Sequence, residues 1–266
     1  VYNYKNKYFA ELNGAYNGTD NFAKKNRYGF FPAVSAGYVI SKEDFMRDIT
    51  FINMLKVRGS YGLVGNDQFS GRRWPFISEY AGAAGYVFGE TLSNGIGGIS
   101  EGALANPDVT WEIAAKSNVG FELGILNDLF TVKADYFDEK RRDILISRNT
   151  VPGIIGASGS SLPAVNWGKI NNKGFEIELG HRNKIGQVNY FLNVNITQAK
   201  NKIIFMDEAP AAHPWQAYTG RPIGQLYGLT SIGFFQSQED IDNSPTQYGN
   251  VIPGDIKYAD LNKDGI

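Results

Sequence analysis

Strict alternation of apolar and polar residues constrains this chain more than any other feature. In VNYFLNVNIT (Val188–Thr197) every second residue from Val188 to Ile196 is apolar, and the residues between them are polar except Phe191. Successive side chains of a β-strand point to opposite faces, so the stretch predicts a strand with one apolar and one polar face. A soluble β-sandwich buries the apolar face, whereas a membrane barrel turns it to lipid. The period alone does not decide between them.

The same period recurs along most of the chain. It predicts roughly eight strands, with a hairpin turn at Asn127–Asp128 and another in NKIG before Val188. Glu43–Asn53 predicts a short amphipathic turn or helix, and a strand is expected around Trp74–Tyr80. Three segments lack alternation and predict long loops: 67–106, 149–167 and 207–266. Tight turns at one end of the strands and long loops at the other are typical of outer-membrane barrels.

Composition narrows the function classes. The net charge of −1 gives no basic surplus for nucleic acid. The chain has no cysteine, which excludes disulfides and thiolate metal sites. No apolar run approaches the ~20 residues of a membrane helix, but barrel strands do not need one. Glycine (31 residues) and aromatics (14%) suit strands and tight turns.

The distribution of charges and tyrosines favours the membrane barrel. Mid-strand charges lie on the polar faces, the apolar faces carry none, and tyrosines recur near strand ends as in an interfacial girdle (Tyr8, Tyr16, Tyr136, Tyr190). The predicted fold is all-β, an antiparallel transmembrane β-barrel with long extracellular loops. The residues expected to face lipid are Val188, Tyr190, Leu192, Val194 and Ile196.

Six phrases, in order along the chain, resemble the C-terminal barrel of SusC/RagA-type TonB-linked outer-membrane proteins. They are NRYGFFPAVSAGYVISKEDFM, INMLKVRGSYGLVGN, NPDVTWEIAAKSNVGFELGILNDLFTVKADYFDEKRRDIL, VNWGKINNKGFEIELGHRNK, YFLNVNITQAKNKII and PGDIKYADLNKDGI. The ordered set is specific to this family and covers most of the chain.

The resemblance implies a barrel of about 22 strands with a plugged lumen, in the outer membrane of a Bacteroidetes-type bacterium. Residues 1–266 would be part of this single barrel domain, without the plug, the TonB-contacting segment and the last strands. The implied partners are a SusD-type surface lipoprotein that forms a lid, TonB through the absent N-terminal region, and outer-membrane lipid. The implied activity is TonB-driven uptake of oligosaccharides or peptides.

One motif predicts a calcium site. DLNKDG (260–265) matches the opening of a calcium loop, in which Asp260, Asn262 and Asp264 can converge their oxygens on one hard cation. The alternative without a bound ion is an Asx-rich turn.

Loop aromatics are candidate ligand contacts, and four of them, Trp74, Tyr80, Trp167 and Trp215, could stack on sugar faces. Packing against other loops or a lid protein is the stronger expectation for any one of them, because aromatics are enriched in protein interfaces.

A catalytic site is not expected. Glu176 and Glu178 share one strand face at a spacing that any strand provides, so they predict a solvated surface rather than a glycosidase pair. The two histidines, His181 and His213, lack further ligands at metal spacing. Gly156–Ser161 has no strand–turn–helix context and predicts loop. Two other classes stay open beside the importer: a β-sandwich glycan-binding module (lectin or adhesin), and, last, a glycan hydrolase.

Overall fold

A computed structural model describes residues 1–68, 73–90, 92, 94–156 and 161–265. It forms two compact units, Val1–Ile223 and Gly224–Ile266. The predicted loop in Gly156–Ser161 lies mostly outside the described residues. No helix within the described ranges is long and apolar enough to cross a membrane.

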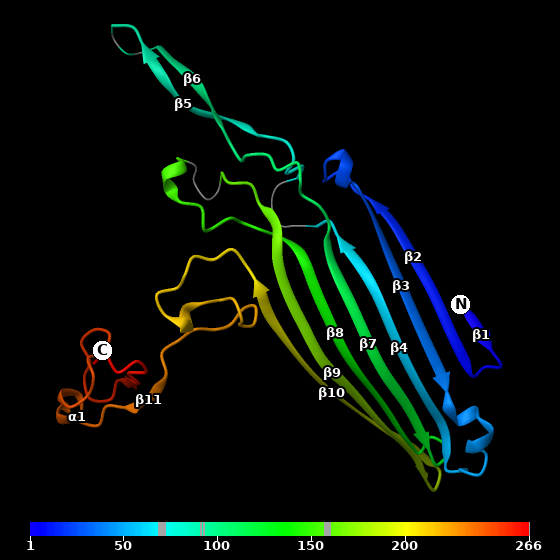
Figure 1. Cartoon of the computed structure of the whole chain (residues 1–266). Helices are drawn as coiled ribbons and strands as arrows, with labels where there is room; N and C mark the ends of the chain where they lie inside the picture. Colours follow the sequence, from blue (N-terminus) through cyan, green and yellow to red (C-terminus); the bar gives the residue numbers. More distant parts are fainter. Residues whose placement is uncertain (69–72, 91, 93, 157–160, 266) are drawn as a thin grey trace. The chain divides into compact units, whose positions relative to one another are not determined.

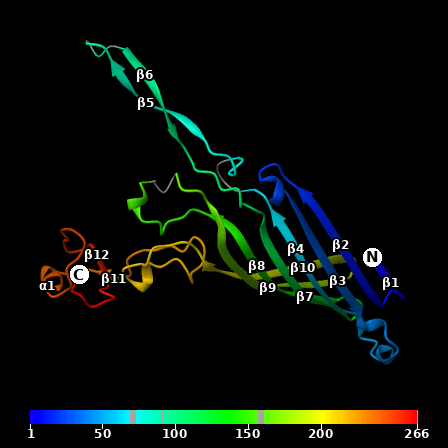
Figure 2. The same ribbon diagram turned by 45° about the horizontal axis from the view of Figure 1, so that its top comes forward.

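The first unit is built on an eight-stranded antiparallel sheet in the order β1-β2-β3-β4-β7-β8-β9-β10 (Figure 1). Its strands are β1 (Tyr2–Tyr4), β2 (Tyr8–Gly18), β3 (Tyr28–Val39), β4 (Ile52–Asn66), β7 (Glu112–Ile125), β8 (Phe130–Ile146), β9 (Val165–Ile185) and β10 (Val188–Phe205). The strands β2, β3, β4 and β7 lie side by side also in the turned view of Figure 2.

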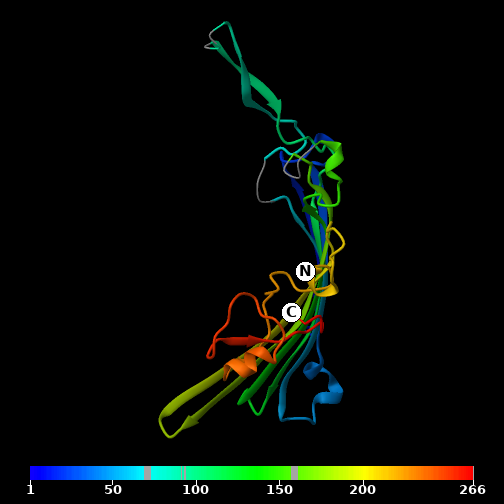
Figure 3. The ribbon, with the colours of Figure 1, turned by 90° about the vertical axis from the view of Figure 1, so that its left-hand side faces the viewer.

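Within the first unit the eight strands form a single layer, and among its described residues no second sheet packs on either face of it (Figure 3). This is the arrangement of a barrel wall and not of a β-sandwich, where two sheets enclose a core. The wall is open, because in the part of the chain that the structure describes β1 pairs with β2 alone and β10 pairs with β9 alone.

Short and long connections lie at opposite ends of the sheet. Leu126–Leu129 joins β7 to β8, and Gly186–Gln187 is a two-residue turn between β9 and β10 in which Gly186 has φ +61°. Asn127 and Asp128 are left-handed as expected of a turn, and Leu126 shares that conformation. The two predicted hairpin turns are therefore present.

Two 3₁₀ turns, η2 (Ile40–Lys42) and η3 (Asp44–Met46), lie at the turn end of the sheet. The turn η3 lies inside the stretch Glu43–Asn53 that was predicted to be a turn or helix, and η2 directly precedes it. At the other end lie η1 (Lys24–Asn26), η4 (Gly153–Ile155) and η5 (Pro214–Gln216).

The predicted loop 67–106 contains a separate two-stranded sheet, β5 (Tyr80–Phe88) and β6 (Asn94–Glu101). The strand expected around Trp74–Tyr80 is not there; a strand begins only at Tyr80. The register shifts between Ala83 and Tyr86, which breaks the alternation that would have marked this hairpin in the sequence. The predicted loop 149–167 ends earlier than expected, because β9 begins at Val165.

The second unit occupies the later part of the predicted loop 207–266. It contains β11 (Ser231–Phe234), paired with β12 (Ile256–Tyr258), and one short helix, α1 (Gln238–Asp242). Phe235 is buried, and the Lys257 ammonium lies 5.4 Å from its ring centroid. Lys257 also forms an ion pair of 2.7 Å with Asp240, which links β12 to α1.

The largest buried cluster of the first unit lies at the loop end of the sheet. Phe22, Phe31, Val109 and Trp111 pack together, and Leu63, Ile113 and Leu145 lie against them. Elsewhere both faces of the sheet are largely exposed, so most large apolar side chains of the strands find no cover within this chain.

Candidate functional site

The two faces of the eight-stranded sheet differ in chemistry, and one of them is charged. Lys56, Glu122, Lys133 and Glu178 lie directly opposite one another on four successive strands, so that cation and carboxylate alternate. Two ion pairs join them within this row, Lys56 Nζ to Glu122 Oε1 at 3.4 Å and Lys133 Nζ to Glu178 Oε1 at 3.2 Å. We name this side the inner face.

A second inner-face ion pair crosses an intervening strand. Arg58 on β4 and Asp135 on β8 both lie opposite Gly120 of β7, yet Arg58 Nη2 reaches Asp135 Oδ2 at 2.7 Å. Arg58 Nε also lies 3.3 Å from Glu122 Oε1. The pair can span two strand spacings because Gly120 places no side chain between the partners.

The Gly120→Val variant will break this bridge. A Cβ on Gly120 would lie 2.4 Å from Asp135 Oδ1 and 3.0 Å from the Ala134 carbonyl oxygen, so Asp135 must move away from Arg58. We expect a loss of about 1–3 kcal/mol in the free energy of unfolding, as for other overpacked sites. Denaturant titration of the full-length protein in lipid measures it. The Gly82→Val variant is the control, because a Cβ there meets nothing within 4 Å.

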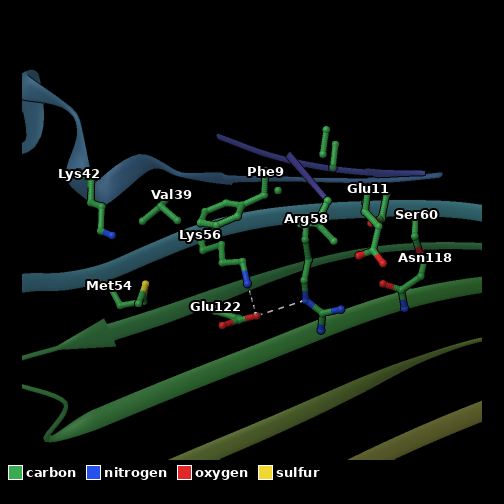
Figure 4. Close-up of a pocket in the computed structure, with 16 residues that line it drawn as sticks. Phe9, Glu11, Val39, Lys42, Met54, Lys56, Arg58, Ser60, Asn118 and Glu122 are labelled. Carbon is green, nitrogen blue, oxygen red and sulfur yellow. Dashed lines mark hydrogen bonds and ion pairs between the residues drawn. The ribbon is translucent and has the colours of Figure 1, made fainter. Parts of the chain in front are cut away.

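A hollow of about 570 Å³ lies over the inner face of β2–β4 and β7. Figure 4 shows Glu122 between Lys56 and Arg58, with Phe9, Glu11 and Asn118 around them. Each cation and carboxylate of the Lys56–Glu122–Arg58–Asp135 network has an ionic partner. This part of the inner face is therefore a solvent-accessible surface of mixed charge, which can make weak, transient contacts with polar solutes.

The two glutamates considered as a glycosidase pair belong to the same wall. Glu178 pairs with Lys133, and Glu176 lies opposite Asp135 on the neighbouring strand. Among the described residues no group of three or more His, Asp or Glu side chains is placed to hold a metal ion.

The other face carries an apolar band, which His181 and Asn183 of β9 interrupt opposite Leu192 and Tyr190. The predicted lipid-facing residues of β10 are all solvent-exposed, from 37% for Tyr190 to 66% for Val188, and Leu192 is 59% exposed. The neighbouring strands continue the band with residues of the same face: Phe130, Val132, Ala134 and Tyr136 on β8, and Phe175, Ile177 and Leu179 on β9. We name this side the outer face.

The apolar band crosses the sheet diagonally. It runs from Tyr8 to Tyr16 on β2 and from Val188 to Ile196 on β10. Tyr8 and Ile196 nevertheless lie in one row of paired residues, which continues through Tyr38, Val57, Phe121, Ala134 and Ile177. The band therefore shifts by about eight residues over the six strand spacings from β2 to β10. With ~3.3 Å per residue and ~4.8 Å per spacing, the strands are inclined by about 40° to the direction perpendicular to the band.

The aromatic residues predicted as ligand contacts are exposed but do not converge. Trp74 packs under the Arg73 guanidinium at 4.8 Å, and Trp215 stacks on His213 at 4.4 Å between ring centroids. The Arg148 guanidinium lies 5.5 Å from Trp167, and Tyr80 is 70% exposed on β5. Within the described ranges no ring contact joins any two of Trp74, Tyr80, Trp167 and Trp215, so a shared sugar platform stays a prediction.

The predicted calcium loop lies in the second unit and folds as a tight turn. Asp260 accepts hydrogen bonds from the amides of Lys263 (2.7 Å) and Gly265 (2.9 Å), and these bonds lower the pKa of Asp260 below its ordinary value. Asn262 donates from its side chain to Asp264 at 2.5 Å. Lys263 and Gly265 have positive φ, as a sharp turn requires. These contacts fit an Asx-rich turn, and calcium binding stays a prediction.

Asp207 is a connecting residue that sequence reasoning missed. Only 7% of it is exposed, and it accepts hydrogen bonds from the Thr150 hydroxyl (2.7 Å) and from the amides of Asn149 (2.7 Å) and Thr150 (3.1 Å). It thereby ties the connection after β8 to the segment after β10. An aspartate in a non-alternating stretch carries no sequence signal for so distant a contact.

Acid will release this connection. The Thr150 hydroxyl, helped by the Thr150 and Asn149 amides, lowers the pKa of Asp207 below its ordinary value. A carboxylate with a depressed pKa stabilises the fold fully above its unfolded pKa of ~3.9, and the contribution is lost as pH falls through the folded value. We expect the protection factors against hydrogen exchange at Asn149 and Thr150, which are corrected for the intrinsic pH dependence of exchange, to stay constant at pH 5–7 and to fall below about pH 4. In the Asp207→Asn variant the exchange should lose this acid step; an unchanged step would assign it to another group.

Comparison with known proteins finds one family along nearly the whole chain. The family described as "TonB dependent receptor-like, beta-barrel" matches residues 2–264. Two TonB-dependent receptors of Formosa agariphila, P3 and P26, are 29% and 30% identical over 99% and 100% of this chain. TonB-dependent receptor SusC of Bacteroides thetaiotaomicron is 27% identical over 76% of it. The chain covers 27% of the length of P3 and P26 and 20% of SusC.

Solved structures share the fold. The RagAB peptide importer in its closed-closed state matches 86% of this chain with a TM-score of 0.69 and 19% identity, and this chain covers 24% of the matched chain. The structure of the RagAB peptide transporter gives the same TM-score and identity over 87%. The single open sheet thus corresponds to part of a larger barrel.

Proposed function

Because this chain belongs to the TonB dependent receptor-like β-barrel family, whose members are outer-membrane proteins, we propose that it forms part of the wall of a SusC-type importer. The importer takes up oligosaccharides or peptides across the outer membrane, energised through TonB. The diagonal apolar band carries this proposal. An inclination of about 40° is the strand tilt of a membrane barrel, in which a level lipid layer meets each successive strand at a different residue.

In this arrangement the outer face contacts lipid. The stretch from Val188 to Ile196 is nine residues of β10, which matches the roughly 9–11 residues with which a tilted strand crosses the apolar zone of a membrane. The charged inner face then lines the lumen, where its ion pairs stay hydrated and its mixed signs favour neither charge on a passing solute.

The loop end of the sheet faces the cell exterior, because outer-membrane barrels place short turns in the periplasm and long loops outside. We propose that a SusD-type lipoprotein covers this end. The exposed apolar side chains of the β5–β6 hairpin support a protein contact there, since an isolated two-stranded hairpin is marginally stable in water. Trp74, Tyr80 and Trp167 belong to the same end and serve either the lid or the cargo.

Isolation of the parent protein from native outer membranes tests the proposal. An antibody to residues 1–266 captures it from mild detergent, and mass spectrometry identifies the proteins that accompany it. We expect a parent several times heavier than this chain, in the outer-membrane fraction, with a surface lipoprotein bound. Uptake of labelled oligosaccharides or peptides should then stop in cells that lack the parent protein or TonB. A soluble parent of this chain's own mass would instead identify a lectin-like module.

A further inference from the structure

Four lysines lie together on the outer face of β8–β10, just beyond the loop end of the apolar band. Lys173 on β9 and Lys200 on β10 are directly opposite each other. In the next row toward the loops, Lys140 on β8 and Lys202 on β10 lie on either side of Asn171. All four are exposed. We name Lys140, Lys173, Lys200 and Lys202 the lysine cluster.

The register fixes the height of the lysine cluster. Tyr136 and Phe175, opposite each other, form the last apolar row on β8 and β9. Lys173 and Lys200 lie one row above them and Lys140 and Lys202 two rows above, at ~7 Å per row. The cluster is thus on the loop side of the apolar zone, within reach of the headgroups of the outer leaflet.

The lysines of the cluster differ from the cations of the inner face in their partners. On the same strands, inner-face Lys133 and Arg141 each have a carboxylate at ion-pair distance. In the cluster, only Lys140 has one, Asp138 at 3.7 Å, and that lysine side chain is 66% exposed. No described carboxylate forms an ion pair with Lys173, Lys200 or Lys202.

Two like charges directly opposite each other destabilise a sheet, as Lys173 and Lys200 are here. Asp138 lies opposite Lys173 on the other side, but the ion pair that it forms is with Lys140, so the Lys173–Lys200 repulsion is offset only in part. An anion between the two ammonium groups removes that repulsion. The apolar band directly below supplies a surface for acyl chains, so the ligand that matches both features has a phosphate head and a hydrocarbon body.

We propose that the lysine cluster binds the headgroup phosphates of an anionic lipid of the outer leaflet. The inference rests on the outer-membrane orientation given above and goes beyond transport itself, because the site faces away from the lumen. Bound lipid would hold this part of the wall at a fixed depth in the membrane.

The test uses the full-length protein, purified in detergent and transferred to nanodiscs of neutral phospholipid. Lipid A carrying its phosphates is titrated in, and bound lipid is counted by native mass spectrometry. The Lys173→Gln/Lys200→Gln variant is compared with Lys24→Gln/Lys184→Gln, which removes the same charge from η1 and from the turn end of β9. The Lys173→Arg/Lys200→Arg variant keeps the charge and should bind as the unsubstituted protein does.

We expect Lys173→Gln/Lys200→Gln to raise the apparent Kd for lipid A on the order of tenfold to thirtyfold, at about a factor of five per lysine near an anionic surface. Dephosphorylated lipid A should bind to the unsubstituted protein as weakly as phosphorylated lipid A binds to the Lys173→Gln/Lys200→Gln variant. Equal Kd values for the two glutamine variants, or undiminished binding of dephosphorylated lipid, would overturn the proposal. Displacement of the lipid by millimolar inorganic phosphate alone would also overturn it, since the site would then recognise the free ion. A parent absent from the outer membrane would refute the proposed function instead.

Discussion

Arginine in place of Leu192 will lower the free energy of unfolding of the full-length protein in lipid by about 2–4 kcal/mol, whereas arginine in place of the adjacent Asn193 will not. Leu192 is the central residue of the β10 band, with Val188 and Ile196 equally far to either side. In the proposed orientation it therefore lies at the depth where a charge on the lipid face costs most. Asn193 points to the inner face and is exposed, so a longer side chain at this position can extend into solvent.

The two variants distinguish the effect of facing lipid from the effect of placing an arginine anywhere on β10. Both place the same residue on the same strand one position apart, so backbone propensity and net charge are matched. Refolding into phospholipid vesicles followed by denaturant titration gives the two free energies, and the folded fraction in outer membranes gives a cellular readout. Equal losses in both variants, or a larger loss at Asn193, would reverse the assignment of the two faces.

The second large effect is expected at Trp111, where alanine will cost about 3–5 kcal/mol of local stability. Trp111 is 6% exposed and meets the rings of Phe22 and Phe31 edge to face, at 5.5 and 5.2 Å between centroids. This contact joins the connection after β2, the strand β3 and the segment entering β7. Loss of the indole would leave a cavity in the largest buried cluster of the first unit.

Hydrogen exchange of the residues around Phe22 and Val109 measures this local opening. The Trp111→Phe variant should lose far less local stability than Trp111→Ala. The Trp111 Nε1 is buried without a hydrogen-bond partner, so its removal leaves no group unsatisfied. Trp215→Ala is the control, since Trp215 is half-exposed and should change stability by less than about 0.5 kcal/mol. Similar exchange rates in Trp111→Ala and Trp215→Ala would mean that the cluster does not hold the loop end together.

The strands of the main sheet could be predicted because apolar and polar residues alternate along most of their length. Once Gly186–Gln187 is recognised as a two-residue turn, the pairing of β9 with β10 follows, and so does the opposition of Lys173 and Lys200. The pairing of β4 with β7 could not be derived in this way, because 45 residues separate Asn66 from Glu112. The Arg58–Asp135 ion pair depends on that pairing and on the empty position at Gly120.

The β5–β6 hairpin and the Asp207 contact were not predictable for different reasons. Apolar residues lie on both faces of the hairpin, and its register shift removes the period that marks a strand. The Asp207 contact joins residues 57 and 58 positions apart through connections that have no period at all. Local pattern carries no information on such contacts, so they need the folded chain.

The inclination of the strands has a consequence for the row of alternating charges on the inner face. In a closed barrel with tilted strands, a row of paired residues runs perpendicular to the strands. Such a row follows a helical path around the barrel axis and does not lie at one depth in the membrane. Lys56, Glu122, Lys133 and Glu178 therefore lie at successive depths, and a solute moving along the pore axis meets plus, minus, plus and minus in turn. In the proposed importer the electrostatic potential along that path averages toward zero, and we expect this wall to bind neither cationic nor anionic cargo strongly.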